Sequence, residues 1–483
     1  MRSEEHLHPV AMLIGAIKTT RRWISALVFP GIAFLVSQGF SLWTMTLFLF
    51  GLIVVAMLAA LWGFLSWRAT TYTVTGNAFR LRQGVFQKNE RTIPLDHVQS
   101  VDTVQGIIQR VFGVVEVRIE TAGGGANEPD ASLSALDLEA AEALRREIEG
   151  SQRERSEDAA GPTVLRRLSR RELLIAGATS GQIGIALSLL AVGSQFLDEF
   201  FSEDFVRGLV ETFAPNWLMV VLIVLPAGTL LAWLLAIAGT VLAFSGFTLS
   251  REGDFLYIKR GLLERREATI PLARIQAVRI SEGVLRQPFG LAALRVESAG
   301  YGEDAGVSTT LFPLLPRHEV DEFLSVAAPE FAVDPALKPL PRRALRRYVF
   351  RATVPALIAA VVSAGLLFLA FESALGLLAL LLVPPAAAYG WLGYRDAGWA
   401  FEEDRLVVRY RSLGRKTAVA PRRRLQSRGM VRSPLQRRLR LATFLAEVAS
   451  GSGGSTLRVT DLDERSAESL VGNLGPGARL AEA

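Results

Sequence analysis

The sequence predicts a membrane protein in which six transmembrane α-helices form three hairpins, each followed by an α+β domain. Half of the residues are hydrophobic although 21% are charged, so the charges must be separated from long apolar runs. Six runs reach about 20 residues, the length of a helix that crosses the hydrocarbon core. A short phrase recurs after each pair of runs, which indicates one structural unit used three times.

The six apolar runs carry almost no charge. They are Trp23–Phe40, Trp43–Leu65, Leu173–Val192, Trp217–Phe244, Val349–Phe371 and Ala374–Tyr394. The exception is Arg351, one turn into the fifth run, whose long side chain we expect to reach back to the membrane interface. Only a few residues separate the first run from the second and the fifth from the sixth, which predicts two tight helical hairpins. A longer acidic loop over residues 193–216 joins the third run to the fourth.

Basic residues precede the first, third and fifth runs. They are Lys18, Arg21 and Arg22, then Arg166, Arg167, Arg170 and Arg171, then Arg342, Arg343, Arg346 and Arg347. Lys and Arg flank the side of a membrane protein that stays in the cytoplasm. The sequence therefore predicts a multi-pass protein of the cell inner (plasma) membrane. Both termini and all three long polar segments are expected in the cytoplasm, and the loop over residues 193–216 is expected outside it.

The chain has no cysteine and four histidines, which limits the chemistry it can carry. Disulfides and Cys-ligated metals are excluded, and no spacing pairs a nucleophile with a base or builds a metal site. We therefore expect a protein that is not an enzyme, with no catalytic residues, no cofactor and no metal. A net charge of +6 on a membrane protein favours contact with anionic lipid headgroups, and nucleic acid is not expected as a partner.

The repeated phrase places Gln five residues after Pro. It reads Thr-Ile-Pro-Leu-Asp-His-Val-Gln-Ser from Thr92, Thr-Ile-Pro-Leu-Ala-Arg-Ile-Gln-Ala from Thr269, and Val-Ala-Pro-Arg-Arg-Arg-Leu-Gln-Ser from Val419. A second motif starts eight residues after each Gln and ends in Phe-Gly in two copies and in Leu-Arg in the third. We expect Pro to begin a bend and Gln to tie the loop to the backbone. The residues with this structural role are Pro94, Gln99, Gly113, Pro271, Gln276, Gly290, Pro421 and Gln426.

Alternating strands and one amphipathic helix make up each polar segment. In the first copy, residues 71–75 and 78–85 alternate around the turn Gly76-Asn77, which predicts a β-hairpin. A third strand leads into the repeated phrase, and two more strands follow the second motif. The segment closes with a helix over Asp137–Glu149, where Leu138, Ala141, Leu144 and Ile148 share one face. This pattern predicts a curled antiparallel sheet whose open end is covered by the helix.

The repeat also predicts where the parts of the chain begin and end. The expected parts are a cytoplasmic N-terminal segment 1–21; transmembrane hairpin 22–65 and domain 66–150; linker 151–171, hairpin 172–244 and domain 245–330; and linker 331–347, hairpin 348–394 and domain 395–483. The segment 151–161 is polar, which is typical of a flexible linker, and residues 333–341 are rich in proline, which favours a stiffer one.

The paired runs, the Thr-Ile-Pro-Leu-x-x-[Val/Ile]-Gln phrase and the Phe-Gly that follows it resemble the bacterial PH-like membrane proteins of the YdbS/YdbT type. The segment Leu7-His8-Pro9 is similar to the start of that family, and three repeats are similar to its longer, YdbT-like members. The resemblance implies PH-like domains, each with two bent antiparallel sheets capped by a C-terminal helix. It also implies that a smaller PH-like membrane protein is a candidate partner, and it implies no particular biochemical activity.

A basic run marks the third domain. Residues 395–440 contain fourteen Lys or Arg against four Asp or Glu. Near an anionic leaflet each basic residue contributes on the order of 1 kcal/mol. The candidate contacts for anionic lipid or a partner are Arg409, Arg411, Arg415, Lys416, Arg422, Arg423, Arg424, Arg437, Arg438 and Arg440. The alternative is a solvated face in an arginine-rich protein.

These observations favour a non-enzymatic membrane protein that presents three cytoplasmic PH-like domains at the inner leaflet. The domains would bind a protein partner, anionic lipid or one another, as in a scaffold or envelope-associated protein. The alternative is a component of a transporter or channel in which the domains act in assembly or gating. Parallel rather than inverted repeats and nearly uncharged spans speak against that alternative. The sequence predicts no oligomeric state.

Overall fold

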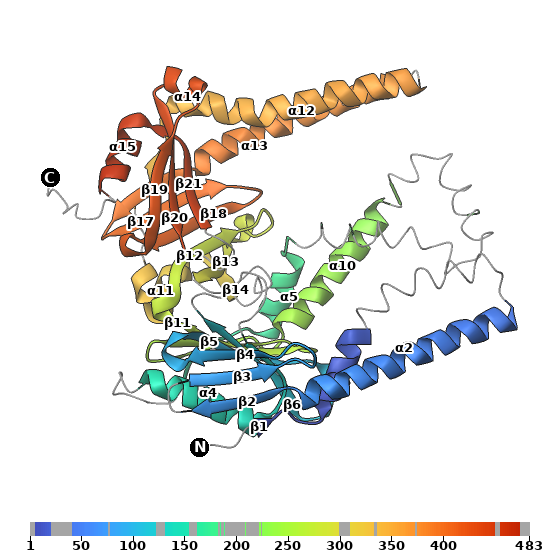
Figure 1. The fold of residues 1–483 in the computed structure, drawn as a ribbon. Helices are drawn as coiled ribbons and strands as arrows, with labels where there is room; N and C mark the ends of the chain where they lie inside the picture. The colour runs from blue at the N-terminus through green and yellow to red at the C-terminus, as the bar shows by residue number, and fades with distance from the viewer. Residues whose placement is uncertain are drawn as a thin grey trace. The chain divides into compact units, whose positions relative to one another are not determined.

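The computed structural model describes residues 5–20, 41–75, 78–121, 131–153, 162–181, 225–298, 310–332, 336–371, 374–449 and 455–473, with five further residues between 182 and 224 (Figure 1). The chain divides into two compact units. One consists of Met1–Arg167 and Leu242–Ala273, and the other consists of Leu168–Val241 and Arg274–Ala483. The boundary falls within the second of the three repeats.

Four helices of the described residues are long and apolar enough to cross a membrane. They are Leu42–Arg68, Leu225–Phe244, Arg342–Leu366 and Gly376–Asp396, and they match the second, fourth, fifth and sixth predicted spans. The predicted run Trp23–Phe40 lies outside the described residues, as do residues 182–192 except 184 and 188, and the loop 193–216 except Gly208. The first two hairpins therefore stay predictions.

The third hairpin is described and is closely packed. Helix α12 (Arg342–Phe371) lies against the 3₁₀ helix η9 (Ala374–Leu382) and helix α13 (Val383–Asp396). A Cβ at Gly390 would lie 2.7 Å from the carbonyl oxygen of Tyr348, so only glycine permits this approach. The change from 3₁₀ to α-helix coincides with Pro384 and Pro385. Proline has no N–H group to donate to the carbonyls of the preceding turn, so an α-helix begins at these residues more readily than it passes through them.

The first repeat forms two antiparallel sheets capped by a helix. The first sheet has the order β1 (Glu5–His6), β2 (Thr71–Thr75), β3 (Ala78–Gln83) and β4 (Asn89–Pro94), and β5 (Val98–Gln105), β6 (Val114–Thr121), β7 (Ala131–Asp137) and α4 (Leu138–Arg153) follow. Phe79 of the first sheet, Ile119 and Leu133 of the second and Ile148 of α4 belong to one buried core. In β2 and β3 alternate residues face this core, as the period of two in the sequence predicts. Strands β6 and β7 also place adjacent residues in it, near an irregularity in their pairing.

The same order of elements recurs twice. The second repeat has β8 (Thr163–Arg167), β9 (Thr248–Glu252), β10 (Phe255–Arg260), β11 (Arg265–Pro271), β12 (Ile275–Glu282), β13 (Leu291–Ser298), β14 (Thr310–Pro316) and α11 (Val320–Ala327). The third has β15 (Lys338–Pro339), β16 (Gly398–Glu402), β17 (Arg405–Arg411), β18 (Arg415–Pro421), β19 (Leu425–Val431), β20 (Leu441–Val448), β21 (Ser455–Asp463) and α15 (Glu464–Asn473). Strands β8 and β15 lie in the segments 151–171 and 331–347. Those segments therefore supply sheet edges as well as links between domains.

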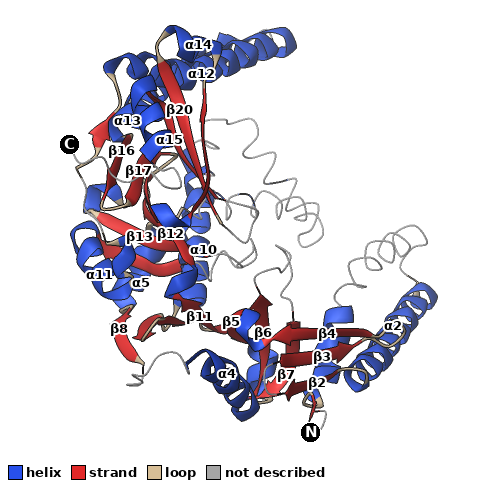
Figure 2. Ribbon diagram, turned by 60° about the vertical axis from the view of Figure 1, so that its left-hand side comes forward, coloured by secondary structure: helices blue, strands red, loops and turns tan. Residues whose placement is uncertain are grey.

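The sheets join successive repeats, which the sequence did not predict. Strand β5 of the first repeat pairs with β11 of the second (Figure 2). Strand β12 of the second repeat pairs with β18 of the third. Each junction is the centre of a seven-stranded sheet. Gln105 faces Arg265 at the first junction, and Glu282 faces Arg415 at the second. These residues are equivalent when the repeats are aligned on Pro94, Pro271 and Pro421, so the two junctions share one register.

The repeated phrase forms the same turn in all three copies. Its Pro is the last residue of β4, β11 and β18, one turn of 3₁₀ helix follows, and the next strand begins one residue before the Gln. The side-chain amide of Gln276 donates to the carbonyl oxygen of Arg274 at 3.1 Å, which fixes the turn to its own backbone. Because the turn carries the chain from one sheet to the other, it sets the start of the junction strands.

The second motif ends in a left-handed residue in every copy. The φ angles are +70° at Gly113, +61° at Gly290 and +50° at Arg440. A Cβ at Gly113 or at Gly290 would meet no heavy atom within 4 Å. Glycine is therefore favoured there by the positive φ angle and not by a close contact. The third copy keeps the conformation although its residue has changed to arginine. A left-handed residue with a Cβ costs about 1–2 kcal/mol.

Replacing Arg440 with glycine should stabilise the third repeat by about 1 kcal/mol, because the left-handed backbone would lose its steric cost. Gly290→Ala should destabilise the second repeat by a similar amount. Thermal unfolding of both full-length variants in detergent measures the two effects. Tm shifts of the same sign for the two variants would show that the backbone angle is not what these positions have in common.

Gly414→Val tests the second junction. A Cβ at Gly414 would lie 2.4 Å from the carbonyl oxygen of Glu282, at the end of β12, so a larger residue must push β12 and β18 apart. We expect a loss of about 1–3 kcal/mol, as for other overpacked sites. Amide hydrogen exchange should become faster in residues 415–419. Gly429→Ala is the matched control, since a Cβ there has open space.

Candidate anion-binding site

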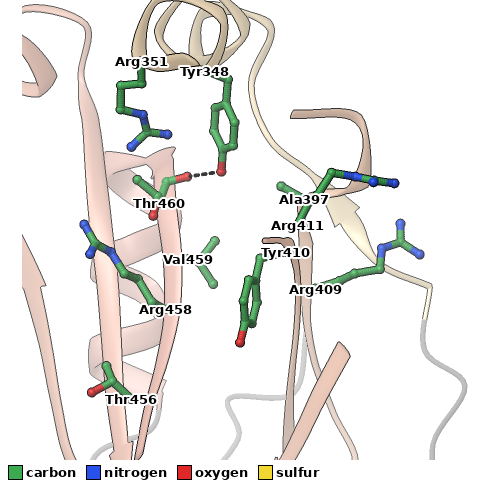
Figure 3. Close-up of a pocket in the computed structure, with 10 residues that line it drawn as sticks. All are labelled: Tyr348, Arg351, Ala397, Arg409, Tyr410, Arg411, Thr456, Arg458, Val459 and Thr460. Carbon is green, nitrogen blue, oxygen red and sulfur yellow. Dashed lines mark hydrogen bonds between the residues drawn. The ribbon is translucent and has the colours of Figure 1, made fainter. Parts of the chain in front are cut away.

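Two adjoining cavities lie beside the first turns of α12 in the third repeat. One has a volume of ≈ 270 Å³ and is lined by Tyr348, Arg351, Ala397, Arg409, Tyr410, Arg411, Thr456, Arg458, Val459 and Thr460 (Figure 3). The other has a volume of ≈ 320 Å³ and is lined by Arg347, Arg351, Val431, Ser433, Gln436, Thr443, Leu445, Arg458 and Thr460. Arg351, Arg458 and Thr460 belong to both.

The arginines of β17 contribute little charge to the first cavity. The guanidinium groups of Arg409 and Arg411 lie on the side of β17 away from Tyr410 (Figure 3). Arg409 donates to the backbone carbonyl of Asp396 at 2.8 Å, and Arg411 pairs with the Asp396 carboxylate at 2.5 Å. Burial and then the nearby Arg415 lower the pKa of Arg409 from its ordinary value. These two residues therefore hold the end of α13 against the sheet.

The positive charge of the second cavity comes from two different elements. Arg347 and Arg351 project from α12, and Arg458 projects from β21. The guanidinium of Arg351 lies 4.7 Å from the ring centre of Tyr348, whose hydroxyl donates to the carbonyl oxygen of Thr460 at 3.2 Å. This contact places Arg351 over the outer face of β21, where Arg458 also lies.

A single carboxylate organises this cavity. Asp461 is fully buried and accepts from Arg347 at 2.9 Å, lies 3.2 Å from Arg351, and accepts from the Gln436 amide at 2.8 Å. Gln436 also donates to Thr443 at 2.8 Å. One carboxylate thus serves two arginines, and no ion pair of Arg458 occurs among the residues that the structure describes. The cavity keeps a surplus of positive charge.

The cavity has the chemistry of an oxyanion site. Guanidinium groups bind phosphate and carboxylate oxygens through paired N–H donors, and the hydroxyls of Ser433, Thr443 and Thr460 supply further donors. A volume of ≈ 320 Å³ lies near the lower end of the range for small-molecule sites, which fits a phosphate-bearing headgroup. Within the described residues, no group of three or more His, Asp or Glu side chains is placed to hold a metal ion.

Half of the ten candidate residues in the predicted basic run form ion pairs with carboxylates of the second or third repeat. Arg415 pairs with Glu282 and Asp396, Arg422 with Asp404, and Arg423 and Arg424 with Glu330. The pKa of Glu330 is lowered, since these two arginines outweigh the effect of its burial. Burial lowers the pKa of Lys416. These contacts give the arginines of the run a structural role.

The remaining basic residues lie on a short helix and the turn after it. Arg437 and Arg438 are exposed on α14 (Pro434–Arg438), and Arg440 occupies the left-handed turn. The sequence did not single out Arg458, Arg347 or Tyr348 as site residues. Arg351 could have been found, because a charged residue inside an apolar run requires a partner.

Each repeat uses a polar contact to hold the helical segment before it. Lys18, at the end of the helix Val10–Thr20, pairs with Glu116 of β6 at 3.2 Å. Arg286 donates to Thr179 at 3.1 Å and to the carbonyl of Ala176, at the end of α5 (Arg170–Ala178). Arg286 is the third residue of the second motif, and its equivalent in the third repeat is Gln436. Lys18, one of the basic residues that predict orientation, therefore also fastens a helix to a sheet.

Comparisons with known proteins agree with this architecture. The family model described as Bacterial PH domain matches residues 21–152, 204–329 and 353–476. The chain is 31% identical over 490 residues to UPF0699 transmembrane protein YdbT of Bacillus subtilis (strain 168), and the match covers 98% of each chain. No solved structure matches this chain. The resemblance inferred from the repeated phrase is confirmed.

Replacing Asp461 with Asn should destabilise the third repeat by about 3–5 kcal/mol, because Arg347 and Arg351 would lose their shared partner. Asn tolerates the left-handed φ of +60° at this position, so the change tests the charge and not the backbone. Thermal unfolding and limited proteolysis in detergent measure the effect.

The matched control is Asp463→Asn, which removes the ion pair with the partly exposed Arg343. An exposed pair contributes about 0–1 kcal/mol. If both substitutions lowered the Tm equally, the buried carboxylate of Asp461 would not be the main contact that holds α12 against the sheet.

Proposed function

The chain belongs to the bacterial PH domain family, and on this premise we propose that it is a non-enzymatic membrane protein that binds anionic headgroups at the inner leaflet. Six spans in three hairpins would anchor three PH-like domains on the cytoplasmic face of the membrane. The third domain would bind the headgroup in the cavity beside α12.

The observation that carries the proposal is the position of Arg458. It is exposed, it has no ion pair among the described residues, and it shares a cavity with Arg351 of an apolar helix. The first turns of that helix carry Arg342, Arg343, Arg346 and Arg347, which favour the cytoplasmic interface. A phosphate bound at the cavity would thus lie at headgroup depth.

The family and the composition support the same reading. The similar transmembrane protein matches 98% of this chain. The cavity is small and polar, which suits a headgroup and not an acyl chain. A scaffold of this kind needs no catalytic group, because its interaction depends on position and charge alone.

Arg458→Ala should weaken binding of a short-chain phosphatidylglycerol by about ten- to a hundredfold, because one charge-assisted contact is worth about 1.5–3 kcal/mol. Native mass spectrometry of the full-length protein in detergent, titrated with dioctanoyl phosphatidylglycerol and with the phosphatidylcholine of equal chain length, measures the affinity. The zwitterionic lipid should bind weakly to both proteins.

Arg438→Ala is the matched control, since Arg438 is exposed in the same repeat but outside both cavities. An equal loss for the two variants would assign binding to the general positive charge of the domain. No preference of the unaltered protein for the anionic lipid would overturn the proposal.

A further inference from the structure

Among the strands that the structure describes, one sheet edge in the first repeat and one in the last have no neighbouring strand. Strand β4 is the outer strand of its sheet, and β19 is the outer strand of the sheet β19-β20-β21, among the strands that the structure describes. The equivalents of β4 are β11 and β18, and the equivalents of β19 are β5 and β12. All four pair with a neighbouring repeat. The chain therefore carries both halves of a junction that it forms twice internally.

The exposure of these strands agrees with their missing partners. Thr92 of β4 is exposed, whereas its equivalents Thr269 and Val419 are 3% and 1% exposed. No residue of β19 is buried, whereas β12 is mostly buried. An exposed strand edge offers unpaired N–H and C=O groups to another strand, and proteins generally cover or block such edges.

We propose that β19 of one copy of this chain pairs antiparallel with β4 of a second copy, in the register of the two internal junctions. When the repeats are aligned on the Pro of the repeated phrase, Gly429 is equivalent to Arg279 and Arg91 is equivalent to Ala418. Because Arg279 faces Ala418 at the second junction, the same register places Gly429 opposite Arg91 and Met430 opposite Glu90. The pairing is head to tail, so it leaves one free β4 and one free β19 for further copies.

The side chains at the free edges fit this register. At the second junction the long side chain of Arg279 faces the small Ala418. At the free edges the large side chain is on the other strand, since Arg91 of β4 would face Gly429 of β19. A Cβ at Gly429 would have open space, so there is room for the Arg91 side chain. Glu90 lies diagonal to Arg428, which places opposite charges within reach.

One position brings like charges together. Lys88, just before β4, faces Arg432, just after β19. Arg432 already pairs with Glu464, so its charge is compensated within its own repeat. The two internal junctions also hold a basic residue at the position equivalent to Lys88, where Arg265 faces Gln105 and Arg415 faces Glu282.

A second copy is the occupant that the structure supports, because the matching edges lie on the same chain. Each internal junction links repeats that follow one another in the same direction, each after its own apolar helices. Copies inserted in one membrane with the same orientation can continue this order. The strands need no rearrangement, since β4 and β19 are already extended.

Disulfide trapping tests the proposal, and the natural absence of cysteine removes any background. Five single variants are made in full-length protein: Glu90→Cys and Arg91→Cys in β4, Met430→Cys and Gly429→Cys in β19, and Leu413→Cys as a control outside both edges. Pairs of variants with tags of different size are expressed together in membranes and oxidised. Directly opposed residues of antiparallel strands have Cα atoms about 4.5–5.5 Å apart, which permits a disulfide.

The expected result is a mixed-tag dimer for Met430→Cys with Glu90→Cys, or for Gly429→Cys with Arg91→Cys, at least tenfold above the unmatched control of Gly429→Cys with Leu413→Cys. Leu413 is 78% exposed and lies outside both edges. Dimers of Gly429→Cys alone would show that β19 pairs with itself, which would overturn the proposal. The proposal would also be overturned if neither matched pair gave a dimer although each variant, once extracted in detergent, eluted as folded protein.

Discussion

The pairing of strand edges between repeats is the constraint on which this structure depends. In a single PH-like domain two bent sheets leave open edges, and backbone N–H and C=O groups at an edge need partners or solvent. Here the edges of successive repeats satisfy one another through β5 and β11 and through β12 and β18. The stability of each repeat is therefore linked to that of its neighbour.

Polar contacts between helices and sheets form the second level of organisation. Glu116, Arg286 and Asp461 hold helical segments in the first, second and third repeats through different chemistry at related places. The first contact is an ion pair, the second uses backbone carbonyls, and the third is a buried carboxylate shared by two arginines. Because the residue types differ, comparison of the three copies by identity alone does not reveal the shared role.

The local structure could be predicted from the sequence. The hairpin strands, the turn at Pro94 and the closing helix each follow from patterns within about ten residues. The sequence predicted separate curled sheets and so missed the junctions, because alternation fixes which face of a strand is buried but not which strand lies beside it. The sequence likewise did not indicate the ion-pair partners of the basic run. Arg415 finds Glu282 and Arg423 finds Glu330, from segments about 90 to 130 residues earlier in the chain.

The shared register of the two junctions has a consequence for how such chains change in length. Inserting or deleting one whole repeat leaves every internal junction complete and the same two kinds of strand at the ends. A deletion that stops in the middle of a repeat instead exposes a strand that was covered before. Genes that encode this architecture can therefore vary in the number of modules, and the boundaries of such duplications should coincide with the segment before each helical pair.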